Sequence, residues 1–395
     1  MILKKFLHWD NSCIMINLLY FFDYLNHYKH KQAIWYQFMN FSRKYQHFSI
    51  RFLIWLTLLL VFQYSLVACT AEEQTTPQPK IENTPTITPT ATRIPTKDPN
   101  LGLGTSENPI KIAYIISGDP QSALQSSAAF ISQLSNETNL VYEFVPYQNA
   151  TEAFEDLRIQ KFQFIWLQPL TYLAAEEREL ATPILVSNHF GLYRYGTQIF
   201  ANISSNFMVY FDPASSTTTS NPDVALNQLE GKRPCWTDPS SLSGTIMPSG
   251  YLAMYGIHTQ PPVFVQNHTS VIRALYIKEI CDFGATFGYS GDPRTSSGVI
   301  RDLPDAIEKI VVIWRSEPNI PSLNLSVAQN VPENITLKTK SALIFLIRTD
   351  EGKKNLSQAL SYDVQDLLEI NAQYYNDVRD LVKAADIVPY QHLGY

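Results

Sequence analysis

The chain has 395 residues, of which 45% are hydrophobic and 17% charged, enough for one large or two medium globular units. Its net charge of −6 does not favour nucleic acid as a partner. Four cysteines (Cys13, Cys69, Cys235, Cys281) are too few for a disulfide scaffold and lack the spacing of a metal site. We therefore expect no bound metal and no cofactor.

An uncharged stretch from Phe52 to Ala68 follows three basic residues and has the parts of a secretory signal peptide. It ends in Leu66-Val67-Ala68-Cys69, which resembles the bacterial lipobox, in which the cysteine becomes the lipid-bearing first residue. This predicts cleavage before Cys69 and an extracytoplasmic protein held to the cell membrane by lipid. The alternative is an uncleaved anchor, for which 17 residues is at the short end.

The segment from Met1 to Ala68 is more than twice the length of an ordinary signal peptide, about 30 residues. The 30 residues from Met39 to Ala68 contain every required part. We therefore predict that translation starts at Met39 and that residues 1–38 are an extension from a misplaced start codon.

Residues 69–108 are predicted to form a tether. Between Gln74 and Pro99 lie eight Thr and six Pro, a composition that cannot bury enough apolar surface to offset the ordering entropy. Proline-rich segments of this kind are extended spacers, although an O-glycosylated stalk is an alternative reading.

From Pro109 onward, strands and helices alternate. The first series has predicted strands at Ile110–Ile116, Leu140–Pro146 and Phe162–Leu167, with helices at Ala123–Leu134 and Thr151–Ile159. This rhythm favours a parallel sheet with crossover helices.

A second series of strands and helices follows, and its pattern predicts a second α/β lobe. In such folds ligands bind at the carboxyl ends of strands and at helix N-termini. The predicted elements are strands at Arg233–Thr237, Val263–Gln266, Cys281–Thr286 and Ile310–Trp314, and helices at Gly250–Tyr255, Ser270–Ile280 and Asp363–Ala385.

The segment Thr237–Thr245 is rich in hydroxyl residues and lies between a predicted strand and a predicted helix. Free backbone N–H groups and the helix dipole favour an oxyanion at such a place. Taken alone, an ordinary Ser-rich N-cap loop is the better reading, because Ser and Thr are preferred caps. His268 lies at an equivalent strand-to-helix junction and is a candidate donor to an anion. His189 and His258 have no such context and are expected to be surface or core residues.

Five segments in this order resemble phosphate/phosphite/phosphonate-type substrate-binding proteins of ABC transporters, over roughly Pro109 to the C-terminus. The resemblance implies the type II periplasmic-binding-protein fold, an α/β fold of two lobes, each a mostly parallel sheet flanked by helices, with the ligand between the lobes. It places lobe one at 109–204 and 316–395 and lobe two at 205–315. The segments are FIWLQPLTYLAA (Phe164–Ala175), TDPSSLSGTIMP (Thr237–Pro248), NHTSVIRAL (Asn267–Leu275), CDFGAT (Cys281–Thr286) and VIWRSEPNIP (Val312–Pro321).

The resemblance implies a set of ligand contacts. The family's Ser-Thr-Ser-Gly anion loop falls on Ser241-Leu242-Ser243-Gly244, where Leu242 replaces the threonine and Thr245 is the nearest substitute hydroxyl. The family's histidine falls on His268. Its lobe-one tyrosine falls near Ala150, three residues from Tyr147, and a second aromatic corresponds to Tyr193 or Tyr195.

Family members that bind aminophosphonates hold the ammonium group with carboxylates. The corresponding positions here are Tyr289 and Leu323, neither of them acidic, with Asp292 nearby. Since a buried ammonium without a partner is costly, an aminophosphonate is disfavoured.

Two further features are expected near the cleft. Tyr172 follows the third strand of lobe one, where it either faces the ligand or lies in the core. Cys235 and Cys281 precede functional-looking turns in one lobe, so an exported protein is expected to join them by a disulfide; two buried free thiols are the alternative.

These features predict a solute-binding component of an ABC importer that captures a small oxyanion, closes around it and presents it to a membrane permease. We expect a monomer. No hydrolase motif is present, and Ser243, His268 and Asp292 fit an anion cradle better than a catalytic triad. The alternatives are a sensor without a transport role, a member with a different small ligand, and a protein whose cleft has lost ligand binding.

Overall fold

The computed structural model describes residues 100–394. The predicted signal peptide, Cys69 and most of the predicted tether lie outside the described residues. Residues 101–108, which we assigned to the tether, pack on the folded part: Leu103 is buried, and the Gly104 carbonyl accepts a hydrogen bond from Val141 N–H. In the part that is described, no helix is both long and apolar enough to cross a membrane.

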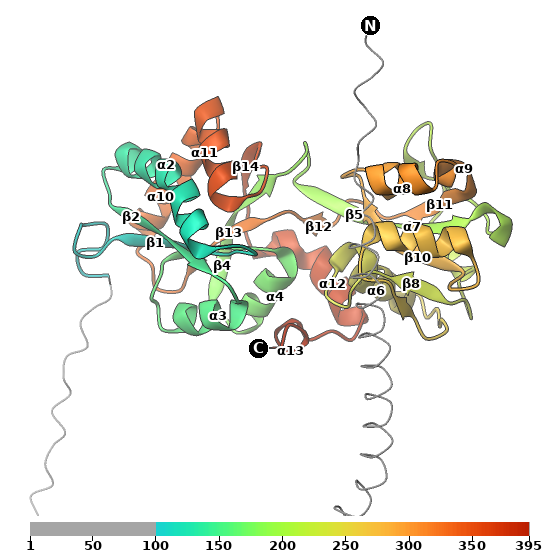
Figure 1. Ribbon diagram of the computed structural model, residues 1–395. Coiled ribbons are helices and arrows are strands. Elements are labelled where there is room, and N and C mark those ends of the chain that lie inside the picture. The colour runs from blue at the N-terminus through green and yellow to red at the C-terminus, as the bar shows by residue number, and fades with distance from the viewer. Residues whose placement is uncertain (1–99, 395) are drawn as a thin grey trace, which may run out of the picture. The chain divides into compact units, whose positions relative to one another are not determined.

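One six-stranded sheet has the order β14-β4-β13-β3-β1-β2 (Figure 1). β1 runs parallel to both β2 and β3, whereas β13 and β14 make antiparallel pairs. The strands are β1 (Ile110–Ile115), β2 (Tyr142–Tyr147), β3 (Phe164–Leu167), β4 (Ala181–Asn188), β13 (Asn324–Ala328) and β14 (Asp366–Glu369).

Side chains of successive strand residues point to opposite faces of this sheet, and both faces are apolar and covered. Ile112 is in register with Phe144 and Phe164, and all three are buried in the core cluster that includes α2 (Pro120–Thr138), α10 (Glu333–Leu346) and α11 (Asp350–Leu360). On the opposite face, Ala113 and Ile165 are buried in a second cluster, which includes residues of α3 (Ala150–Arg158) and α4 (Pro169–Glu177).

The second sheet has the order β11-β5-β10-β8-β9, and β12 also pairs with β5. β10 is parallel to β8 and antiparallel to β5. One face packs on α7 and the other on α6. The elements are β5 (Arg194–Asn202), β8 (Pro234–Trp236), β9 (Val263–Phe264), β10 (Phe283–Gly288), β11 (Ile310–Arg315), β12 (Ile320–Pro321), η2 (Leu242–Ile246), α6 (Met247–Met254) and α7 (His268–Ile277).

The two sheets confirm the α/β class and the two-lobed architecture, but the prediction of mostly parallel sheets was wrong. Each sheet is mixed, with parallel pairs at one end and antiparallel pairs at the other. The physical reason is the crossing between lobes. β13 enters the first sheet from β12 without a crossover helix, so it runs opposite to β3.

The chain passes between the sheets at β4–β5 and again at β11–β13. The C-terminal part, which we placed wholly in lobe one, touches both lobes. α12 (Asn376–Ala384) packs on α6, where a β-carbon at Gly250 would lie 2.2 Å from the Leu381 carbonyl oxygen. α13 (Pro389–His392) packs on α4 of the first lobe.

The remaining described elements are short. They are η1 (Ile203–Ser205), β6 (Phe211–Asp212), β7 (Thr217–Thr218), α5 (Pro222–Asn227), η3 (Pro293–Thr295), α8 (Ser297–Asp302), α9 (Ala306–Lys309) and η4 (Ala372–Tyr375).

Cys235 and Cys281 are joined by a disulfide in the structure, with a Cα–Cα distance of 5.6 Å. The bond is possible because β8 and β10 are paired, with Cys235 in register with Gly284. It ties the strand that leads into the hydroxyl-rich loop to the segment between α7 and β10.

Candidate functional site

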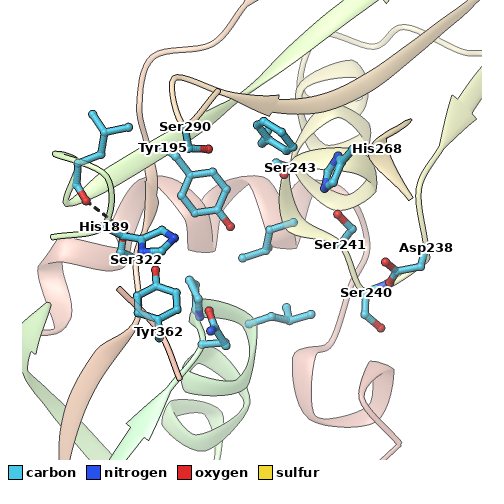
Figure 2. A pocket seen from close by; sticks show the side chains of 16 residues that line it. His189, Tyr195, Asp238, Ser240, Ser241, Ser243, His268, Ser290, Ser322 and Tyr362 are labelled. Carbon is cyan, nitrogen blue, oxygen red and sulfur yellow. Dashed lines mark hydrogen bonds between the residues drawn. The ribbon is translucent and has the colours of Figure 1, made fainter. Parts of the chain in front are cut away.

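A cavity of about 400 Å³ lies between residues of the two lobes (Figure 2). The side nearest the first sheet includes Gln168, Leu170, His189, Ser322 and Tyr362. The side nearest the second sheet includes Asp238, Ser241, Ser243, His268, Phe287 and Ser290.

The hydroxyl-rich loop after β8 forms one wall. Ser241 caps η2, and its Oγ accepts a hydrogen bond from Gly244 N–H at 3.2 Å. The N–H groups of Leu242 and Ser243 have no acceptor among the described residues. Because unpaired amides at a helix start attract negative charge, this wall is suited to an oxyanion.

The Ser243 side chain lines the cavity, and a hydrogen bond to its carbonyl oxygen holds its backbone in place. Thr197 on β5 is fully buried, and its Oγ1 donates a hydrogen bond to the Ser243 carbonyl oxygen at 2.6 Å. The strand that crosses between the lobes therefore holds the loop in position.

Gly244 and Thr245, which the resemblance placed at the anion, do not line the cavity. A β-carbon on Gly244 would lie 2.1 Å from Thr237 Oγ1, so close packing beneath the loop requires glycine. Thr245 Oγ1 donates to the Asp238 carbonyl oxygen at 2.7 Å. Both residues shape the loop, and the Thr245 hydroxyl does not substitute for the one missing at Leu242.

His268 begins α7 and lines the cavity beside the loop. Its ring meets Phe287 edge to face at 4.7 Å, and its Nδ1 is buried without a hydrogen-bond partner in the described part of the chain. Burial lowers the pKa of His268, and the Asp238 carboxylate partly offsets this shift. The imidazole is therefore held neutral near pH 7 until an anion approaches it.

The three candidate tyrosines have different environments. Tyr195 on β5 lines the cavity, and burial raises the pKa of its phenol. Tyr193 lies outside the cavity lining, and its hydroxyl donates to Asp366 at 2.5 Å. Tyr172 is fully buried and donates to Glu176 at 2.7 Å, so it belongs to the core. Tyr195 lies on β5, Tyr193 precedes that strand, and Tyr172 lies on the buried face of α4.

The family's lobe-one tyrosine has no equivalent here. Ala150 is buried, and Tyr147 is buried with its hydroxyl bonded to Asp156 at 2.9 Å. Neither lines the cavity.

The two positions at which the resemblance places an ammonium-binding carboxylate hold Leu323 and Tyr289, and both side chains have other contacts. Leu323 is fully buried, and the Tyr289 hydroxyl donates to the Ser316 carbonyl oxygen at 2.7 Å. Asp292 is paired with Arg294 at 2.7 Å. Among the described residues that line the cavity, however, Asp238 is the one carboxylate; it is exposed and was not among the predicted ligand contacts.

Three residues from distant segments complete the first-lobe side: His189, Ser322 and Tyr362. His189 was expected to be a surface or core residue; instead it stacks on Tyr362 with ring centroids 4.0 Å apart. Since these two residues are 173 positions apart, no local sequence pattern predicts the contact. None of the described residues that line the cavity is Lys or Arg, so the groups there that could contact an anion are backbone dipoles, hydroxyls and imidazoles.

Apolar groups surround the loop as well. Leu170, Leu242 and Phe287 line the cavity together with Pro169 and Leu192. An apolar wall beside unpaired amides suits a ligand with one anionic end and one uncharged end.

A family model described as "ABC transporter, phosphonate, periplasmic substrate-binding protein" matches residues 112–375. Curated protein sequences give no match. Solved structures that resemble the chain include XAC2383 from Xanthomonas citri bound to chloride (16% identity, 72% of this chain, 98% of that chain, TM-score 0.51). PhnD1 from Prochlorococcus marinus in complex with methylphosphonate is also similar (15% identity, 74% of this chain, 100% of that chain, TM-score 0.47).

Proposed function

Because the chain belongs to the family of periplasmic substrate-binding proteins of phosphonate ABC transporters, we propose that it captures a small phosphonate, phosphite or phosphate-like oxyanion between its lobes. Proteins of this family bind small phosphonate-like ligands, work with an ABC permease and are generally not enzymes. The proposed ligand rests on the residues that line the cavity.

The observation that carries the proposal is the wall formed by Ser241, Ser243 and His268. On this side of the cavity lie two backbone amides that have no acceptor within residues 100–394, a serine hydroxyl and an imidazole. Such groups satisfy the oxygen atoms of a tetrahedral anion without a formal positive charge.

The replacement of the family's threonine by Leu242 favours a ligand with an alkyl group over one with only oxygen atoms. Leu242 is 6% exposed, and both it and Leu170 line the cavity. The binding of an alkylphosphonate would bury its alkyl group against these side chains, at about 25 cal/mol per Å² of apolar area.

The sequence before the folded part supports membrane attachment through lipid on Cys69. A lipobox-like Leu66-Val67-Ala68-Cys69 followed by a Thr/Pro-rich segment gives an anchored protein with a spacer. Two acyl chains hold a protein firmly to a membrane, whereas one binds only marginally. Mass spectrometry of the mature protein tests this proposal: an N-terminal peptide that begins at a lipid-modified Cys69 is the expected result.

Calorimetry against methylphosphonate, phosphite and phosphate tests the ligand. We expect Ser243→Ala and His268→Ala each to weaken binding about tenfold or more, because each removes a hydrogen bond to a charged group. Ser132→Ala, on the exposed surface of α2, and His258→Ala, whose side chain is 87% exposed, are matched controls that should bind normally. Wild-type protein that binds none of the three anions would overturn the proposed ligand.

A further inference from the structure

His189 lies where the chain leaves the first sheet and crosses toward the second. It follows β4, and its backbone pairs with Leu192 across a tight turn. The two central residues of the turn, Phe190 and Gly191, have positive φ angles of 50° and 83°. For a bulky residue such as Phe190 this conformation is uncommon, so the surrounding contacts must hold the turn in place.

Three contacts fix the imidazole of His189. Its Nδ1 is 2.7 Å from the carbonyl oxygen of Asp363, and its ring stacks on Tyr362 with an interplanar angle of 17°. The Phe190 ring lies 4.1 Å away. Figure 2 shows the ring at the cavity, across from Ser243 and His268.

The bond to Asp363 sets the tautomer. A carbonyl oxygen only accepts, so Nδ1 must carry the hydrogen, and in the neutral ring Nε2 is then an acceptor. Nε2 has no hydrogen-bond partner among residues 100–394. The fixed ring therefore leaves one lone pair available to a ligand in the cavity.

A lone pair at this place distinguishes between oxyanions. Phosphoryl oxyanions gain a proton near neutral pH, with a second pKa of about 6 in phosphorylated side chains. Their P–O–H group can donate to an acceptor. Sulfonates stay fully ionised and would place an oxygen lone pair against that of Nε2, which is repulsive.

We propose that His189 is a ligand-binding residue whose Nε2 accepts a hydrogen bond from the protonated oxygen of a phosphonate-type ligand and so selects against sulfonates. This inference rests on the proposed function and assigns the first-lobe contact that neither Ala150 nor Tyr147 can provide. His189 then connects the ligand to the crossing between the lobes.

The variant His189→Asn tests the proposal. An Asn side chain places its amide nitrogen near the position of Nδ1, so it can keep the bond to Asp363 while it removes Nε2. We expect wild-type protein to bind methylphosphonate at least about tenfold more tightly than methanesulfonate. In His189→Asn, methylphosphonate affinity should fall about tenfold and most of the discrimination should disappear.

Controls separate a contact from a structural role. The melting temperature of His189→Asn should stay within a few degrees of wild type, because the substitution keeps the bond to the Asp363 carbonyl oxygen. His258→Asn, at the exposed surface, should bind both ligands as wild type does. The ¹⁵N resonance of His189 Nε2 should shift on addition of methylphosphonate.

The outcomes are distinct. If His189→Asn binds methylphosphonate as tightly as wild type, the inference is overturned while the proposed function stands. Equal losses for methylphosphonate and methanesulfonate would overturn the selective role of the acceptor. If wild-type protein binds no oxyanion at all, the proposed function and this inference fail together.

Discussion

Two imidazoles face the cavity from opposite lobes, and their hydrogen bonds make them chemically different. His189 has its Nδ1 bonded to a carbonyl oxygen, which fixes the ring and its tautomer. His268 has a buried Nδ1 without a partner in the described residues. Protonation of His268 would leave a buried N–H unsatisfied, which agrees with the lowering of its pKa by burial.

The His268 shift has a direct consequence for stability. The folded protein binds a proton at His268 less readily than the unfolded chain, whose histidine has a pKa of about 6.5. This contribution to stability is therefore present above pH 6.5 and is lost as the pH falls toward the lowered pKa of the folded state. Urea unfolding at pH 7.5 and 5.5 should show a larger loss for wild type than for His268→Gln. Equal losses in the two proteins would contradict the shift.

At the scale of elements, the hydroxyl-rich loop depends on the strands that pack against it. β8 leads into the loop, Thr237 leaves no space for a side chain at Gly244, and Thr197 of β5 donates to the Ser243 carbonyl. The disulfide joins β8 to the segment before β10. The loop is thus positioned by three neighbouring strands of one sheet, and the proposed oxyanion site depends on such support.

Thr197→Val tests this support. Valine has nearly the same shape, but it removes the donor to the buried Ser243 carbonyl, at a cost of about 1–3 kcal/mol in the free energy of unfolding. We expect weaker oxyanion binding as well, because Ser243 is no longer held. Thr151→Val, at an exposed position of α3, is the matched control and should change neither quantity appreciably. Unchanged stability and binding in Thr197→Val would refute the supporting role.

At the scale of the molecule, both chain crossings and packed helices connect the lobes within residues 100–394. The chain crosses at β4–β5 and at β11–β13, and the C-terminal helices pack on α6 and α4. His392 Nε2 lies 3.0 Å from the Pro239 carbonyl oxygen in the loop before η2. In a hinge closure, short crossings such as those at β4–β5 and β11–β13 absorb the backbone rotations.

A ligand that bridges the lobes should close and stabilise the whole folded part. At a ligand concentration of 100 times Kd, the free energy of unfolding should rise by about 2.7 kcal/mol. Small-angle X-ray scattering should report a smaller radius of gyration with methylphosphonate than without it. Stabilisation without any change in scattering would rule out closure, whereas Ser243→Ala should require more ligand for both effects.

The sequence by itself determined the features that depend on local patterns. A strand at Phe162–Leu167, the hydroxyl-rich loop after the strand Arg233–Thr237 and His268 at a strand-to-helix junction were all predicted, because strand and helix boundaries place such residues at one sheet edge. The strand is β3 (Phe164–Leu167), and α7 begins at His268 itself, two residues before the predicted start. The order of these segments identified the family and the two-lobed fold.

Only the tertiary structure decided which polar side chains reach the cavity. Tyr172 and Tyr193 were predicted as ligand contacts but bond to Glu176 and Asp366, whereas His189, which was not, is held at the cavity by a backbone carbonyl 174 residues away. Local periodicity fixes the direction of a side chain along its own element. Which partner then meets that side chain depends on the packing of segments far apart in the chain, and a sequence pattern does not contain that information.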